Sequence, residues 1–502
     1  MATRAVATGA MVVALWLEIS LIAGAAHAEQ MVPLRGSRPA QASKLGASAL
    51  PADTILDLRV VFAPRHRDEL SRLLRDQQDP SSPDYHRWLT AAEFAARFAP
   101  APADVAAARD WLTGAGLKVR AAGPYLWVSA SAADAERVFA TRMVSSQDGR
   151  LFSPATDPMI PARFASVIAG IAGLDNLLHW KPSVHASSFT ATPDAKIAGV
   201  VGFAPADVYT FYDETPLLSG GIDGSGGRCL AVIEDSDFLD SAVTAFDSAF
   251  HLASANVTKV FPDGTNPGIN GDEIESLLDI EWGHAIAPGA AITAYIGSGA
   301  NALFDAIAQS VTDNACGSIN ISFSFCGASP SFYSGSLDPL FQQAAAQGQS
   351  VFASSGDAGS AGLVLNQAGT ACVPGSTASV SEMSADPAVT AVGGTQFAPR
   401  LNSAGNDVGH VGEKAWNEVI KQNGQQVHLG ATGGGASGVF TKPAYQTGPG
   451  VANDGMRDVP DVAFGAGIVF PGFFMVLDSG NSPQLGCCIG GTSLSSVAWA
   501  GI

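Results

Sequence analysis

Charged side chains are scarce in this sequence, and long apolar runs are missing beyond its first residues. Only 15% of the 502 residues are charged, whereas 47% are hydrophobic, which excludes a disordered or coiled-coil chain and indicates a large compact globule. After the N-terminal segment no 18 consecutive residues are apolar; the longest late run, residues 467–477, is too short and contains Pro471. We therefore expect no membrane span and no membrane partner.

Basic residues are few in the C-terminal part of the chain. Residues 191–502 hold 8 Lys and Arg against 29 Asp and Glu, whereas residues 29–190 hold 18 against 16. Because an acidic surface repels a phosphate backbone, we expect no nucleic acid as a partner. The acidic excess indicates either solubility alone or a protein that works in acid, where protonation relieves the repulsion between carboxylates.

Zinc-binding cysteine patterns are also missing, and the cysteines instead suit an exported protein. Residues 1–28 predict a secretory signal peptide, with a basic Arg4, an apolar core at about residues 10–25 and the small-x-small cleavage motif Ala26-His27-Ala28. In a secreted, extracellular chain disulfides are permitted, and six cysteines allow fifteen pairings. The cysteines are Cys229, Cys316, Cys326, Cys372, Cys487 and Cys488.

The first part of the chain predicts a small domain of mixed strands and helices. Residues 29–54 are polar, small and contain proline, which predicts a loose arm. The elements expected next are a strand at 55–63, helices at 67–77, 90–98 and 102–113, strands at 117–120 and 125–129, a helix at 132–139 and a strand at 142–145. Thr90 and Glu93 fit a capping box. This order predicts a ferredoxin-like α+β domain.

Residues 79–98 carry a resemblance to a known family. They read Asp-Pro-Ser-Ser-Pro-Asp-Tyr-His-Arg-Trp-Leu-Thr-Ala-Ala-Glu-Phe-Ala-Ala-Arg-Phe and resemble the activation prodomain of the sedolisin family, the secreted, kumamolisin-like serine-carboxyl peptidases. Trp111-Leu112 and Leu126-Trp127-Val128 fall where that prodomain has its pattern. The resemblance implies an activation propeptide over residues 29–185, with a core at about 55–147, that serves its own enzyme as inhibitor and folding aid.

A linker and a second domain follow. Residues at about 180–200 are rich in Ser, Thr and Ala, the composition of a linker, and a zymogen is expected to be cut there. The next expected elements are strands at 229–234, 292–296, 318–323, 350–354 and 389–392, with helices at about 274–287, 302–314 and 336–347. This alternation predicts an α/β domain with a doubly wound parallel sheet. The resemblance implies a subtilisin-like catalytic domain over residues 186–502.

Glu275 and Asp279 stand four residues apart, so a helix places them on one face. A solvated acidic face is the ordinary explanation of such a pair, but the apolar run at 285–290 that follows favours a buried one. Glu-x-x-x-Asp followed by Ala-Pro-Gly-Ala resembles the sedolisin signature, which implies that Glu275 is the general base and Asp279 the acid that orients it. Two close carboxyl groups share a proton, which favours activity in acid.

Two further motifs complete the resemblance. Asp357, within Ser-Ser-Gly-Asp-Ala-Gly at 354–359, would ordinarily be a turn residue, but the motif resembles the family's oxyanion-hole segment. An Asp in that role must be protonated to donate a hydrogen bond. Gly-Gly-Thr-Ser at 490–493 resembles the family's serine motif and implies that Ser493 is the nucleophile. An ordinary helix N-cap is the alternative for this motif.

The resemblance also implies a substrate cleft and a metal. Residues 320–327 and 433–437 look like the two extended segments that pair with a polypeptide substrate by strand addition. Because Cys326 and Cys372 flank this cleft, we favour a disulfide between them. Calcium is expected from the family, in an Asp- and Gly-rich segment beyond the serine. The sequence ends nine residues after Ser493, so we expect no metal ligand in this chain.

Several activities compete on these residues. The first is a secreted, acid-acting serine-type endopeptidase made as a zymogen, and the second is a tripeptidyl aminopeptidase of the same family. A third is a Ser-His-Asp peptidase with His284 as base, which we disfavour because His284 lies five residues beyond Asp279 and points off the face of the acidic pair. The alternative from another class is an inactive, peptidase-like binding protein.

Overall fold

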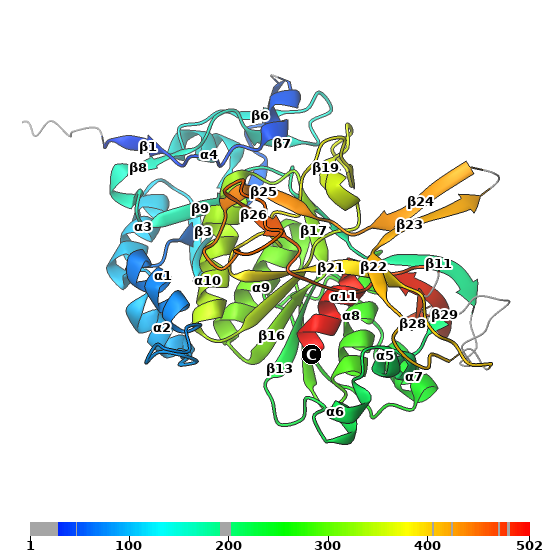
Figure 1. Ribbon diagram of the computed structural model, residues 1–502. Coiled ribbons are helices and arrows are strands. Elements are labelled where there is room, and N and C mark those ends of the chain that lie inside the picture. Colours follow the sequence, from blue (N-terminus) through cyan, green and yellow to red (C-terminus); the bar gives the residue numbers. More distant parts are fainter. Residues whose placement is uncertain are drawn as a thin grey trace, which may run out of the picture.

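The computed structural model describes residues 29–46, 48–190, 202–403, 406–422, 425–469, 472–478 and 482–502. The predicted signal peptide lies outside these residues, as does the later half of the predicted linker. None of the helices within the described ranges has the length and apolar character needed to cross a membrane. The chain forms two parts, an N-terminal domain and a larger domain built on a parallel sheet (Figure 1).

The N-terminal domain is a four-stranded antiparallel sheet with the strand order β4-β5-β3-β9. Its strands are β3 (Ile55–Phe62), β4 (Lys118–Ala122), β5 (Tyr125–Ser131) and β9 (Ile168–Ala172), and its helices are α1 (Arg67–Asp76), α2 (Ala91–Arg97), α3 (Pro102–Gly114) and α4 (Ala132–Val138). The capping box of α2 is present: Glu93 N–H donates to Thr90 Oγ1 at 3.2 Å, and Thr90 N–H donates to the Glu93 carboxylate at 2.8 Å.

Two expectations for this domain are wrong. The fourth strand of the sheet is β9, because β6 (Met143–Ser145) joins β2 (Ser48–Ala49) and β7 (Phe152–Pro154) in a separate sheet. Residues 29–54 are not a loose arm either. Within them β1 (Met31–Pro33) pairs with β8 (Met159–Pro161), and Leu34 and Leu50 are buried in the domain core. The arm's few apolar residues are enough to anchor it, which its average composition conceals.

The second domain contains the predicted parallel α/β sheet. Its order is β14-β15-β13-β16-β18-β21, with β27 also parallel to β21 and β22 antiparallel at the end. These strands are β13 (Cys229–Glu234), β14 (Asn256–Val260), β15 (Ala291–Ile296), β16 (Cys316–Ile321), β18 (Ser350–Ser354), β21 (Val389–Phe397), β22 (Glu413–Ala415) and β27 (Val462–Gly465). Strand β14 was missed because its residues are mostly polar and only half-buried at the sheet edge.

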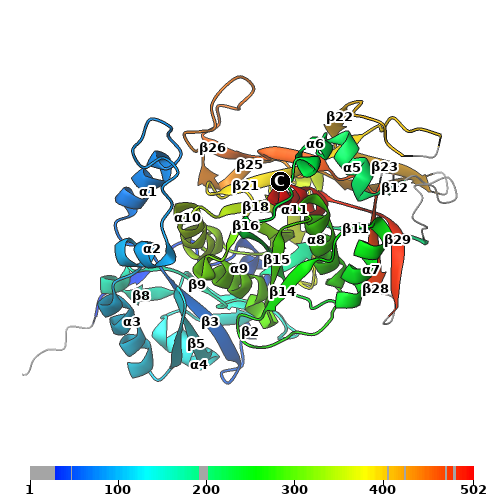
Figure 2. The same ribbon diagram turned by 90° about the horizontal axis from the view of Figure 1, so that it is seen from below.

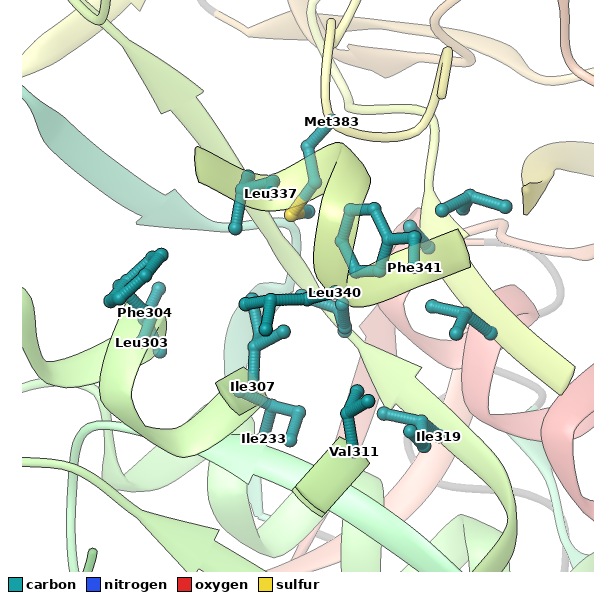
Figure 3. Packing of buried hydrophobic residues seen from close by; sticks show 14 of the residues in the cluster. Ile233, Leu303, Phe304, Ile307, Val311, Ile319, Leu337, Leu340, Phe341 and Met383 are labelled. Carbon is teal, nitrogen blue, oxygen red and sulfur yellow. The ribbon is translucent and has the colours of Figure 1, made fainter. Parts of the chain in front are cut away.

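Helices cover both faces of this sheet (Figures 1 and 2). Alternate residues of β13 show why: Leu230 and Val232 join the core with α7, α8 and α11, whereas Ala231 and Ile233 join the core with α9 and α10. Figure 3 shows the second core, where side chains of α9 and α10 meet over the sheet. The helices are α7 (Asp240–Phe250), α8 (Glu273–Ile286), α9 (Ala302–Asp313), α10 (Asp338–Ala346) and α11 (Thr492–Gly501).

Shorter elements surround the sheet. They are α5 (Pro205–Phe211), α6 (Thr215–Ser219), the pairs β10 (His179–Pro182) with β17 (Phe323–Cys326), β19 (Leu363–Leu365) with β20 (Cys372–Pro374), β23 (Asn417–Gln422) with β24 (Gln425–Ala431) and β25 (Gly435–Thr441) with β26 (Met456–Val459), and the sheet of β11 (His185–Thr190), β29 (Pro483–Gly490), β28 (Gly472–Asp478) and β12 (Gly202–Phe203). The described part of the linker predicted at about 180–200 therefore lies largely in strands β10 and β11. Cys326 and Cys372 form a disulfide, which confirms the favoured pairing. Cys229–Cys316 and Cys487–Cys488 are also bonded.

The two domains contact each other through the N-terminal sheet and α9 (Figure 2). Arg59 of β3 donates from Nε and Nη2 to the two carboxylate oxygens of Asp305 on α9, at 2.9 and 2.7 Å. The Tyr125 hydroxyl donates to the same carboxylate at 2.7 Å, and the Arg59 guanidinium lies 3.7 Å from the centre of the Trp127 ring. Arg59 and Asp305 are both buried, so this is an ion pair shielded from water.

Candidate active site

Ser493 lies in the first turn of α11, a helix that packs against the parallel sheet. The first N–H groups of a helix have no partner inside it, and here the Ser493 N–H donates to the backbone carbonyl of Ser183 at 3.1 Å. The Ser493 hydroxyl donates to the Ser322 carbonyl at 3.1 Å. The preceding Gly491 has φ +120°, and a Cβ there would lie 2.2 Å from the Ser183 carbonyl oxygen, so only glycine fits at this position.

Glu275 and Asp279 lie on the buried face of α8, and both are fully inaccessible to water. The solvated-face explanation of this pair is therefore wrong. Neither Glu275 oxygen accepts a hydrogen bond of good geometry from the described residues. Burial, and next the charge of Asp279, raise the pKa of Glu275 well above its usual range, while the adjacent Ser493 hydroxyl acts to lower it. Glu275 is thus a buried carboxyl group with the serine hydroxyl as its neighbour.

Asp279 is held away from the serine by residues of β16 and its extension. Its Oδ2 accepts from Asn320 Nδ2 at 2.7 Å, and its Oδ1 accepts from Ser322 Oγ at 2.8 Å. Because Ser322 also accepts the Ser493 hydroxyl on its carbonyl oxygen, one residue links the acid to the serine. Burial raises the pKa of Asp279, although these hydrogen bonds oppose the rise. Asp279 therefore contacts the serine only indirectly.

Glu234 is a third buried carboxyl group that the sequence analysis missed. It ends β13, is fully buried, and accepts the Ser276 hydroxyl at 2.9 Å. Burial, and next the charges of Asp279 and Glu275, raise the pKa of Glu234 well above its usual range. A carboxylate at the end of an apolar strand was the available signal, since ligands of parallel sheets gather at the carboxyl ends of the strands.

Asp357 follows β18 and binds the residue next to the serine. Its Oδ1 accepts from the N–H and the hydroxyl of Thr492, at 2.9 and 2.6 Å. Its Oδ2 lies 3.2 Å from Nε2 of His185. A Cβ on Gly491 would lie 2.8 Å from that Oδ2 as well as close to the Ser183 carbonyl oxygen, so both oxygens face the same side of Gly491. Asp357 therefore lies beside the carbonyl group of Ser183 and not beside the hydroxyl of Ser493.

His284 does not belong to this group. It lies on the last turn of α8, where its Nε2 is 2.8 Å from the Ala253 carbonyl and 3.4 Å from Asp247. His284 is therefore excluded as the base for Ser493 in this arrangement. Across the ranges that the structure describes, no group of three or more His, Cys, Asp or Glu is arranged to hold a metal ion. The chemistry available at Ser493 is that of a hydroxyl beside one buried carboxyl group, Glu275, whose charge is coupled to that of Asp279.

One family model and several known proteins are similar to this chain. The family described as "Pro-kumamolisin, activation domain" matches residues 43–177. The chain is 29% identical to Sedolisin of Pseudomonas sp. (strain 101), over 88% of this chain and 75% of that protein. It is 29% identical to Xanthomonalisin of Xanthomonas sp. (strain T-22), over 90% and 58%, and 30% identical to Kumamolisin of Bacillus sp. (strain MN-32), over 71% and 62%. The chain spans less than two thirds of the length of the last two relatives.

Proposed function

The chain belongs to the sedolisin family of serine-type peptidases and carries its N-terminal activation prodomain, and we propose that it is the zymogen of an acid-acting serine-carboxyl endopeptidase. Its substrates are polypeptides, and its own prodomain is its intramolecular inhibitor. The observation that carries the proposal is that the buried carboxyl group of Glu275 lies next to the Ser493 hydroxyl and accepts no hydrogen bond of good geometry from the described residues.

In the proposed mechanism Ser493 Oγ attacks the substrate carbonyl carbon while Glu275 takes the hydroxyl proton as general base. Asp279, fixed by Asn320 and Ser322, shares a proton with Glu275 and keeps it in place. The negative charge that develops on the carbonyl oxygen is stabilised by the Ser493 N–H and by a protonated Asp357. Glu275 then returns the proton to the leaving amine, and water hydrolyses the ester that remains.

We base acid operation on the three carboxyl groups of Glu234, Glu275 and Asp279, which have no basic side chain beside them among the described residues. Among the described residues, no ion pair involves Glu234, Glu275 or Asp279. Three buried carboxyl groups that repel one another cannot all ionise, so at least one proton stays among them. Asp357 also needs a proton in order to donate to an oxyanion. Lowering the pH supplies the proton that Asp357 needs, so the rate of hydrolysis is expected to peak well below neutral.

The finer fold assignments belong to the same proposal. The order β4-β5-β3-β9 with two helical crossings supports a ferredoxin-like prodomain, and the helix-covered parallel sheet supports a subtilisin-like catalytic domain. We place the boundary between the two domains near residue 185, with the propeptide domain at about 29–185 and the catalytic domain at about 186–502. Secretion is supported by the predicted signal peptide and by the three disulfides. Calcium stays an expectation from the family, because the described residues offer no site that fits it.

The test is hydrolysis of an unfolded protein as a function of pH. We expect the chain to digest it in acid, with activity lost in Ser493→Ala and in Glu275→Gln. The matched control is Glu413→Gln, an exposed carboxylate of β22, which should leave the rate unchanged. An optimum near neutral that survives Glu275→Gln would show that the carboxyl groups are not the base.

A further inference from the structure

Residues 179–190 lie in the active site as a substrate would. Strand β10 pairs antiparallel with β17, with Trp180 opposite Phe325 and Pro182 opposite Phe323. The Ser183 N–H then donates to the Ser322 carbonyl at 3.0 Å, and beyond it β11 pairs with β29. Peptidases commonly hold their substrates by adding the peptide as a strand in this way.

We propose that the peptide bond between Ser183 and Val184 is the one at which the zymogen cuts its own chain. The inference rests on the proposed function and names the place on which that function first acts. Its chief support is the position of one carbonyl group. The Ser183 oxygen accepts the N–H of Ser493, the donor that the mechanism assigns to the oxyanion. It also faces the Gly491 backbone beside Asp357 Oδ2.

The reaction at this bond balances without any added reagent except water. Ser493 Oγ forms a bond to the Ser183 carbonyl carbon as its proton passes to Glu275. The carbon–nitrogen bond to Val184 breaks, and the proton on Glu275 goes to the Val184 nitrogen, which becomes a new N-terminus. Water then attacks the Ser183–Ser493 ester, which releases a Ser183 carboxyl group and restores the Ser493 hydroxyl.

The surroundings of Ser183 explain why this residue occupies the position before the cut. Only 2% of its surface is exposed, and its hydroxyl lies 3.1 Å from that of Ser324 and 3.2 Å from that of Ser354. These two hydroxyls enclose a space that holds a small polar side chain. A large side chain at position 183 has no room there unless the backbone moves away from Ser493.

A second contact anchors the segment three residues earlier. Trp180 Nε1 donates to Asp235 Oδ2 at 2.5 Å, and the ring packs against the core formed with α9 and α10. Between these two anchors Lys181 is exposed, and within the described part of the chain no hydrogen bond or ion pair holds its side chain. We therefore expect the enzyme to select a small residue at the position of Ser183 and an aromatic residue with an N–H at the position of Trp180. At the position of Lys181 we expect it to accept any residue.

The experiment is to acidify the purified full chain and to identify the first new termini by intact mass and N-terminal sequencing. We expect a fragment that ends at Ser183 and one that begins at Val184. Ser183→Trp should slow this cut about 100-fold or more, since misplacing a reacting group by about 1 Å costs that much. Lys181→Trp introduces the same side chain at the exposed neighbour and should leave the cut and its rate unchanged.

A synthetic peptide of residues 176–190 separates cleavage from folding of the variants. The processed enzyme should cut it between Ser183 and Val184, should cut the peptide with Ser183→Trp about 100-fold more slowly, and should cut the peptide with Lys181→Trp at the original rate. First cleavage at another bond, in a chain that digests an added protein in acid, would overturn this inference alone. A chain that digests neither itself nor an added protein would overturn the proposed function as well.

Discussion

The carboxyl group of Asp305, between the two domains, and those of Glu234, Glu275 and Asp279, at the active site, are buried to a similar degree but differ in their partners. Asp305 is paired in two places with Arg59 and accepts the Tyr125 hydroxyl. The three active-site carboxyl groups have no ion pair within the described part of the chain. Their hydrogen-bond donors are Asn320 and the hydroxyls of Ser276 and Ser322.

This difference separates a structural charge from a catalytic one. Burial raises the pKa of Asp305, but the Arg59 guanidinium opposes that rise, so the carboxylate can stay ionised and hold the domains together. At the active site burial and like charge both act in the same direction on Glu234 and Glu275. A protein that places carboxyl groups together without a cation keeps protons among them, which a structural ion pair does not require.

The largest expected effect comes from substituting the catalytic carboxyl group, Glu275. Glu275→Gln keeps the shape of the side chain and removes the base, so kcat of the processed enzyme on an unfolded protein should fall about 10⁴-fold or more. Asp305→Asn removes a carboxylate of similar burial and should leave kcat of the processed enzyme unchanged. If the two substitutions lowered kcat equally, burial alone would explain both and the assignment of Glu275 as base would be wrong.

A second prediction concerns Asp357, which contacts Thr492 and not the serine hydroxyl. Loss of one oxyanion donor typically costs about 10²- to 10³-fold in rate, so Asp357→Ala should lower kcat by that amount with little change in KM. Asp357→Asn donates at every pH, so its lower activity should decline less steeply as the pH rises. A pH profile of Asp357→Asn that overlays the wild-type profile would rule out a protonated Asp357 as donor.

The third prediction concerns Asp305, the structural carboxylate between the two domains. Asp305→Asn leaves the buried Arg59 with only the more exposed Asp57 as a counter-charge. Because loss of one partner of a buried ion pair typically costs about 3–5 kcal/mol, the uncut zymogen should unfold at lower denaturant concentration. It should also begin processing at a higher pH than the wild-type chain, since the domains separate more readily. Both effects are measured in the Ser493→Ala background for stability and in the active chain for processing. Asp110→Asn, an exposed carboxylate, is the control.

The smallest expected effect is on the pH dependence of stability. The pKa values of Glu234, Glu275 and Asp279 are raised in the folded chain, so it binds more protons than the unfolded chain above the ordinary carboxyl range. Stability from these groups is therefore full in acid and is lost as the pH rises toward neutral. Glu234→Gln in the Ser493→Ala zymogen should flatten that decline by about 1.4 kcal/mol for each unit of raised pKa. An unchanged slope of unfolding free energy against pH would contradict it.

The local elements of this protein could be predicted because their signals are local. The helix at about 274–287 is α8 to within a residue, since its composition and its boundary at Pro288 are read from neighbouring positions. The strand at 229–234 is β13 without change. The strand expected to end at Val392 runs on to Phe397 through Gly393 and Gly394. A Cβ at those glycines would meet Pro460 and Ala466, which only the folded chain brings near.

By itself the sequence determined the elements, the spacing of Glu275 and Asp279, and the motif around Ser493, because each depends on residues within a few positions of one another. Only the tertiary structure decided that Glu234, more than forty positions before Glu275, lies in the same group of buried carboxyls. It also decided that Ser183 contacts Ser493, more than three hundred positions later in the chain. The physical reason is that a parallel sheet gathers the ends of distant strands at one edge. Burial there, which no local pattern records, then changes the chemistry of the groups that meet.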